Sequence, residues 1–203
     1  MRGGFSNEDC LAVVALMNRE GLDLLELSGG TYESMAMLSS HKTQAAEKES
    51  SGGSAIFSEK EAFFINNARA VKALAKMPVM VTGGFRNVQA MALALAGGDV
   101  DVIGLARPFC VEPEFAGEIL TGRKTELSKF EETLELGPGI FGQQSPFKTF
   151  RVINTVGGAA WFTLQLGLIA EGKEPNWRLS IAEAIMRYLA QGKRAAKILQ
   201  QSL

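Results

Sequence analysis

The chain has 203 residues, of which 46% are hydrophobic and 21% are charged, and its formal net charge is −1. This composition suits a globular protein with a real core, and the charge balance argues against broad attraction to nucleic acid or an anionic membrane surface. No apolar run approaches the ~20 residues of a membrane span and no signal-peptide pattern is present, so we expect a cytoplasmic protein without a membrane partner.

The first expected elements are a helix and a short strand. Ser6 is a candidate N-cap for a helix over residues 8–20, because its hydroxyl can accept a backbone N–H bond. Gly21 supplies a left-handed stop, and residues 22–27 follow as a strand. The polar and small residues of 34–57 then predict a long surface loop.

A second helix and strand come after this loop. Ser58 and Glu61 have the spacing of a capping box, which satisfies two orphan backbone donors and opens a helix that reaches about Lys76. Pro78 stops that helix, and a strand is expected at 79–81. The alternation of helix and strand favours a parallel sheet with right-handed crossovers.

The same rhythm repeats once more. Asn87 caps a helix that ends at the glycine pair 97–98, and a third strand spans 101–105. Pro113 lies in the first turn of the next helix, which reaches Gly122. The inward face of the helix after Asn87 is expected to consist of Val88, Met91, Ala92 and Leu95.

The βα rhythm stops after Gly122. Residues 123–150 are mixed, an apolar helix is expected over 158–171, and a capping box at Ser180 and Glu183 opens a final helix to about Leu199. We interpret this tail as helical cladding, with Trp161, Phe162 and Trp177 as packing groups.

Two strand ends carry the residues best suited to binding an anion. Gly83 and Gly84 follow the 79–81 strand just before a helix begins, so backbone N–H groups at that helix start could bind phosphate. Arg107 directly follows the 101–105 strand, and its guanidinium can bind phosphate oxygens with two charge-assisted bonds. The alternatives are an ordinary βα turn for the glycines and a salt bridge at the sheet rim for the arginine.

Other polar residues give weaker signals. The loop 28–33 with Tyr32 is read as a turn and N-cap, and His41 as an exposed residue without a role. Arg86 is either a second anion contact or a solvated rim charge, and we favour the rim charge. Cys10 and Cys110 show no metal-ligand spacing, and we interpret both as packing residues in a reducing compartment. We therefore expect no metal site.

The motifs together resemble the old yellow enzyme family of FMN-dependent NADH:flavin oxidoreductases. The segment Leu24–Glu33 is similar to the sixth strand of that family and its loop, Pro78–Arg86 to the seventh-strand motif, and Asp101–Pro108 to the eighth-strand motif. The resemblance implies an α/β fold: the C-terminal portion of a (β/α)8 TIM barrel, about strands six to eight, with a helical tail. It covers about residues 3–122 well.

The resemblance also implies domains, cofactors and site residues. Residues 1–122 would form a partial barrel with the FMN-phosphate loops, and 123–203 a helical extension packing on it. FMN would be the cofactor and NAD(P)H the electron donor of the complete enzyme. The implied phosphate-binding residues are Gly83, Gly84, Phe85, Ala106 and Arg107, with Ala106 standing where glycine is usual.

A complete barrel takes about 250 residues and eight strands, so the resemblance implies only part of an enzyme. The family's catalytic residues lie mostly on earlier strands, and none is carried over to this chain. We expect hydride transfer through FMN to an electron-poor acceptor in the complete enzyme, and no catalysis by this chain alone. The alternatives are a non-catalytic fragment acting by assembly and a phosphate-binding barrel with another ligand. Open sheet edges predict a partner chain or self-association.

Overall fold

The computed structural model describes residues 6–28 and 59–201, and these form two compact units. The first, here called the sheet unit, contains residues 6–28, 59–106 and 118–127. The second, the helical unit, contains 107–117 and 128–201. Tyr32, His41, Ser58 and the predicted loop 34–57 lie outside the described residues. The domain boundary predicted after residue 122 stays a prediction.

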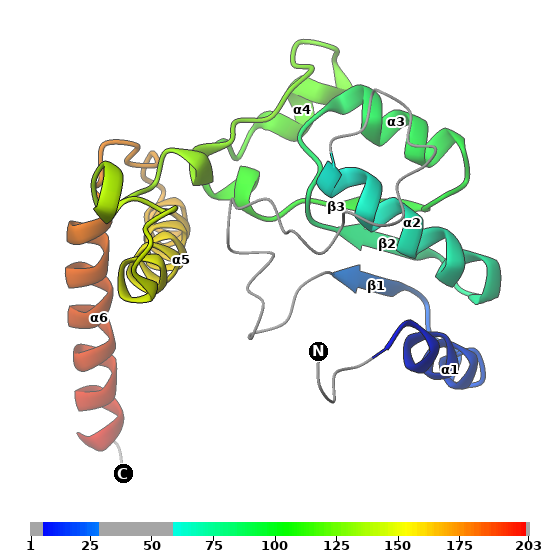
Figure 1. Cartoon of the computed structure of the whole chain (residues 1–203), viewed down its shortest axis with the longest axis horizontal. Coiled ribbons are helices and arrows are strands. Elements are labelled where there is room, and N and C mark those ends of the chain that lie inside the picture. Colours follow the sequence, from blue (N-terminus) through cyan, green and yellow to red (C-terminus); the bar gives the residue numbers. More distant parts are fainter. Residues whose placement is uncertain (1–5, 29–58, 202–203) are drawn as a thin grey trace. The chain divides into compact units, whose positions relative to one another are not determined.

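The sheet unit contains three parallel strands: β1 (Leu25–Ser28), β2 (Val79–Thr82) and β3 (Val102–Gly104) (Figure 1). Their spatial order, β1-β2-β3, follows the chain order. The predicted α/β architecture with a parallel sheet is therefore confirmed. The first strand was predicted three residues too early, because its exposed leucines at 22 and 24 precede the first paired residue.

Helices precede or follow every strand of this unit: α1 (Asn7–Met17), α2 (Glu59–Leu74), α3 (Val88–Ala96) and α4 (Phe115–Leu120), the last crossing from one unit to the other. Ser6 caps α1 as predicted, in a reciprocal capping box with Asp9. Asn87 caps α3 by accepting a bond of 3.1 Å from the Ala90 N–H. Pro113 lies outside α4, because the 3-10 turn η2 (Arg107–Cys110) comes first after β3.

The core of the sheet unit is aliphatic. Its main cluster joins α1, α2 and the sheet through Val14, Leu25, Val71, Met77 and Val79. The predicted inward face of α3 was partly wrong, since Ala92 and Leu95 are exposed whereas Ala90, Met91 and Ala94 are buried. Every residue of this helix except Gln89 is apolar, so hydrophobic periodicity does not fix its orientation. Its small buried alanines allow close packing.

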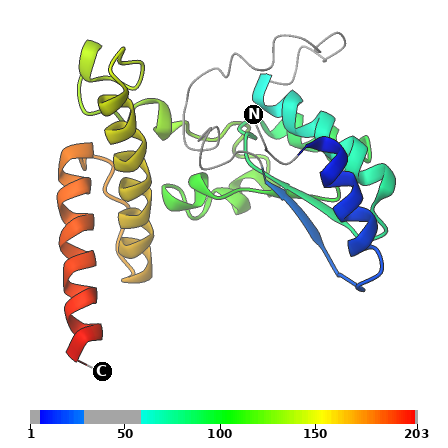
Figure 2. The same ribbon diagram turned by 60° about the horizontal axis from the view of Figure 1, so that its bottom comes forward.

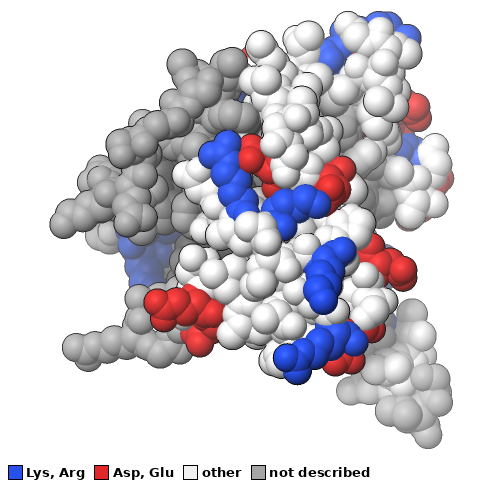
Figure 3. Space-filling view, turned by 90° about the vertical axis from the view of Figure 1, so that its right-hand side faces the viewer, with Lys and Arg blue, Asp and Glu red and all other residues white. Residues whose placement is uncertain are grey.

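Ion pairs lie at the surface of the sheet unit. Arg69 binds Asp99 at 2.6 Å, and the Asp101 carboxylate binds both the Lys72 ammonium and the Val79 backbone N–H, the latter at 2.7 Å. These two bonds, the lysine first, hold the pKa of Asp101 below its ordinary value. Figure 3 shows basic and acidic side chains interspersed over one face of the molecule. Such mixing gives no single-sign patch on that face.

The helical unit is built around two long helices, α5 (Lys148–Ala170) and α6 (Ile181–Gln201), which lie side by side (Figures 1 and 2). Two short 3-10 turns, η3 (Phe130–Glu132) and η4 (Gly139–Phe141), precede them. The predicted helix over 158–171 starts ten residues earlier than expected. Its extra turns contain the buried Asn154, whose amide binds the Leu136 N–H and the Phe141 carbonyl.

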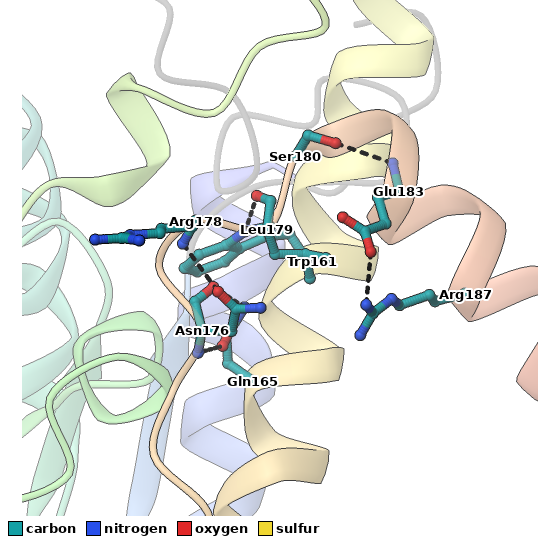
Figure 4. Close-up of polar contacts among 8 residues, drawn as sticks. All are labelled: Trp161, Gln165, Asn176, Arg178, Leu179, Ser180, Glu183 and Arg187. Carbon is teal, nitrogen blue, oxygen red and sulfur yellow. Dashed lines mark hydrogen bonds and ion pairs between the residues drawn. The ribbon is translucent and has the colours of Figure 1, made fainter.

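The core of the helical unit surrounds Trp161 with mostly aliphatic side chains and is held by side-chain bonds to backbone. Trp161 is fully buried, and its indole N–H donates to the Leu179 carbonyl at 2.8 Å (Figure 4). Gln165, also buried, binds the Asn176 backbone through both amide atoms. Ser180 caps α6 by accepting a bond from the Glu183 N–H. The predicted packing role of Trp161 is confirmed.

One expectation about membrane-spanning segments was wrong. By length and composition α5 is long and apolar enough to cross a membrane. Polar residues scattered along it hide this from a search for unbroken apolar runs. Because Asn154, Trp161 and Gln165 of α5 are buried within the helical unit, we interpret it as a core helix.

Candidate functional site

The chain after β2 turns in a way that only glycine adopts readily. Gly83 has φ 120° and Gly84 has φ 81°, so both lie in the left-handed region that side chains disfavour. Asn87 then caps α3, as described above. The structure therefore places two successive glycines between a buried strand and a helix start, where backbone N–H groups lack intrahelical partners.

The end of β3 lies beside the end of β2. Thr82 pairs with Gly104 in the parallel register. A Cβ on Gly104 would overlap the Thr82 hydroxyl and lie 2.9 Å from its Cβ and 3.1 Å from its Cα. The carboxyl ends of these strands thus meet, which brings the loop at Gly83 next to the residues that follow Gly104.

Thr82 also offers an observation that fits a bound polar group. Its hydroxyl oxygen is buried and has no hydrogen-bond partner among the described residues. Buried hydroxyls normally have a partner, so such an atom invites a ligand or a water. This hydroxyl and the left-handed glycines thus lie at the same strand end, beside the residues predicted to bind phosphate.

Phe85 and Arg86 are both buried. Phe85 is 0% exposed as a whole residue, so its backbone is covered as well as its side chain. The Arg86 guanidinium donates to the Phe85 carbonyl at 2.7 Å. The prediction of a solvated rim charge at Arg86 was therefore wrong. The side chain is folded back onto its own turn, a contact that sequence spacing does not reveal.

Ala106 and Arg107 are neighbours in the chain but belong to different units. Ala106 is exposed and ends this segment of the sheet unit, alongside Gly83, Gly84 and Phe85 in the same unit. Arg107 begins η2 in the helical unit, where its Nη1 lies 3.5 Å from Oε1 of Glu131. The sequence left a salt bridge open as the alternative for this arginine, without predicting Glu131 as the partner. The phosphate role of all five residues stays a prediction.

The helical unit contains a cavity that sequence patterns did not indicate. Its volume is about 240 Å³, and its lining includes Arg107, Glu131, Gln143, Arg151 and Phe162. The Arg151 guanidinium is tied to the carbonyls of Ser145 and Pro146 at 2.7 and 3.0 Å. The lining residues come from separate segments, so no local motif marks them.

The described cysteines are packing residues, as predicted. Cys110 is buried in the core of the helical unit, and burial raises the pKa of its thiol, so it stays neutral near pH 7. Cys10 packs against the core of the sheet unit. Within residues 6–28 and 59–201, no group of three or more His, Cys, Asp or Glu side chains could hold a metal ion.

Residues 23–126, roughly half of the chain, match the model of the NADH:flavin oxidoreductase / NADH oxidase family. The chain belongs to this family. The matched region contains all three strands and four of the five predicted phosphate-binding positions in the sheet unit, with Arg107 as the fifth. The resemblance to FMN-dependent oxidoreductases is thereby confirmed. The predicted cofactors, FMN and NADH, are those of this family.

Curated relatives agree with this assignment. The chain is 37% identical over 134 residues to NADH-dependent flavin oxidoreductase iliE of Neonectria sp. (strain DH2), covering 66% of this chain and 16% of the relative. It is 40% identical over 94 residues to NADH-dependent flavin oxidoreductase iccE of Talaromyces variabilis, covering 46% of this chain and 21% of the relative. It is 34% identical over 121 residues to NADH-dependent flavin oxidoreductase nadA of Aspergillus parasiticus, covering 59% of this chain and 24% of the relative. The matches thus cover less than a quarter of each relative's length.

Proposed function

We propose that this chain provides the flavin-phosphate anchor of an FMN-dependent NADH:flavin oxidoreductase. In this proposal β1, β2 and β3 correspond to strands six, seven and eight of a (β/α)8 barrel. The observation that carries it is the left-handed turn at Gly83 and Gly84, next to the end of β3. Loops after the seventh and eighth strands are a common phosphate site in such barrels.

Each proposed residue has a distinct task. The backbone N–H groups of Gly83, Gly84 and Ala106 donate to phosphate oxygens, because these residues are at least partly exposed at the strand ends. Phe85 is 0% exposed, so its place in the anchor is within the turn and not at the ligand surface. Arg107 supplies the positive charge. Bound FMN would supply the redox chemistry, hydride transfer from NADH to an electron-poor acceptor, while the protein supplies position and electrostatics.

We further propose that the chain is not catalytic alone. The support is the sheet of three strands in the described part of the chain, together with matches that cover 16% to 24% of the relatives described above. Residues that would hold the flavin ring and protonate an acceptor are assigned to parts of the complete enzyme that these matches do not cover.

A second candidate, assembly with another chain, has an observation of its own. Among the described residues β1 and β3 are the outer strands of the sheet, each with a strand neighbour on one side only. An unpaired strand edge presents N–H and C=O groups to other chains. A partner supplying further strands, or self-association, would cover these edges. We propose no nucleic-acid or membrane partner and a cytoplasmic location.

Flavin binding tests the first candidate. FMN is titrated into the chain and into Arg107→Ala and Gly84→Ala, with riboflavin as the ligand that lacks the phosphate and Arg19→Ala as an exposed arginine control. We expect both site variants to weaken FMN binding by at least about tenfold, the loss of one charge-assisted contact, and riboflavin binding to be unaffected by Arg107→Ala. Equal FMN affinity in Arg107→Ala and the unmodified chain would refute the anchor.

Light scattering after size-exclusion chromatography tests the second candidate. We expect a mass above that of one 21.8 kDa chain. A stable, folded monomer would speak against assembly through the strand edges.

A further inference from the structure

The proposed phosphate-binding arginine faces a carboxylate within its own unit. Nη1 of Arg107 lies 3.5 Å from Oε1 of Glu131, with the two side chains 23% and 13% exposed. A charge-assisted hydrogen bond measures about 2.7–2.9 Å and is often bidentate for arginine. This pair is longer, so it is a coulombic contact and not a short charge-assisted hydrogen bond.

Glu131 is held in this position by contacts that do not involve the arginine. The Gln143 amide donates to the carbonyls of Glu131 and Leu134 at 2.7 and 2.8 Å, which fixes the backbone of η3. The neighbouring Phe130 ring packs against Trp161 and Trp177, with centroids 6.0 and 5.7 Å apart. The carboxylate is therefore placed beside the guanidinium by the packed frame of the helical unit.

Arg107 and Glu131 also line the cavity of about 240 Å³ described above. The pair therefore borders open space in which a small anion could lie. Arg151, the other arginine of the lining, is already bonded to two backbone carbonyls. Its guanidinium is therefore fixed by the backbone of its own segment.

We infer that Glu131 is an internal anion that competes with the flavin phosphate for Arg107, and so limits how strongly the site prefers FMN to riboflavin. This inference rests on the proposed function. A phosphate that binds Arg107 must displace Glu131 or lie near its carboxylate. Like charges in a partly buried setting are weakly screened, so either event lowers the affinity for FMN.

Titration of the full chain with FMN and with riboflavin tests the inference. In Glu131→Gln we expect FMN to bind about tenfold more tightly and riboflavin affinity to stay unchanged, since riboflavin has no phosphate. Glu132→Gln is the matched control, because it removes the same charge from the exposed next residue of η3. In Arg107→Ala/Glu131→Gln the gain should vanish, because no guanidinium remains to be released.

The outcomes separate the inference from the proposed function. If Arg107→Ala weakens FMN binding but Glu131→Gln leaves it equal or weaker, the anchor stands and the competition is refuted. Should neither the unmodified chain nor Glu131→Gln bind FMN, both are refuted. Binding by Glu131→Gln alone would support both. A gain of similar size for riboflavin or in Glu132→Gln would overturn the competition, and circular dichroism of each variant establishes that it is folded.

Discussion

The two units of this chain hold their residues together in different ways. In the sheet unit, backbone pairing of parallel strands, helix caps and glycine turns fix the structure around an aliphatic core. In the helical unit, buried Trp161, Gln165 and Asn154 bind the backbone of distant segments. The sheet unit is specified largely by local sequence patterns, whereas the helical unit depends on contacts between residues far apart in sequence.

Replacing Trp161 with alanine should change stability the most, and it should do so in the helical unit. We expect a loss of about 4 kcal/mol in the free energy of unfolding of the helical unit, because a fully buried indole and its bond to Leu179 are removed. Near-UV circular dichroism during urea unfolding measures this loss. Hydrogen exchange should show β2 still protected, and simultaneous loss of that protection would contradict two separately held units. Trp177→Phe, at a 58% exposed position, is the control.

Gly104→Ala should damage the sheet unit next most strongly. The new methyl group meets Thr82, including its backbone Cα at 3.1 Å, so β2 and β3 must move apart. We expect a cost of about 2–3 kcal/mol, measured by urea unfolding. Thr82→Ala in the same chain removes part of the overlap and should restore some stability. No restoration would mean that the strands meet differently.

Two adjacent glycines of α5 offer a matched pair in the helical unit. A Cβ on Gly157 would lie 2.5 Å from Cγ2 of Ile181 in α6, whereas a Cβ on Gly158 meets nothing within 4 Å. Gly157→Ala should cost about 1–2 kcal/mol through overpacking. Gly158→Ala should stabilise by up to about 1 kcal/mol, because alanine is the better helix former. Thermal unfolding of the two variants separates the effect of the α5–α6 contact from that of helix propensity. Equal shifts in Tm for the two variants would refute the close contact at Gly157.

The smallest expected effect concerns Asp101. Its folded-state pKa is lowered by Lys72 and the Val79 N–H. Its contribution to stability is therefore present above about pH 4 and is lost as the pH falls through the lowered value. Asp101→Asn should cost about 1 kcal/mol or less near pH 7 and flatten the dependence of Tm on acid pH. An unchanged slope between about pH 5 and pH 2 would contradict the assignment.

These contrasts explain what the sequence could and could not predict. Capping at Ser6 and Asn87 and the alternation of strands with helices are local signals, and the structure confirms them. The approach of Glu131 to Arg107 joins distant segments, and the bond from Arg86 to the adjacent Phe85 carbonyl forms inside a buried turn. They arise where the chain folds back or where distant segments pack, so no spacing in the sequence encodes them.

The strand order has a consequence for how the sheet unit forms. Pairing Leu25 with Val79 closes a loop more than twice as long as pairing Met80 with Val102. Each doubling of a loop adds about 0.6 kcal/mol to its closure entropy, so β2 and β3 should meet in the transition state before β1 joins them. The proposed anchor residues Gly83 and Gly84 then lie in the part that folds first. Slow steps of assembly would fall on β1, leaving the glycine turn already shaped when the sheet is completed.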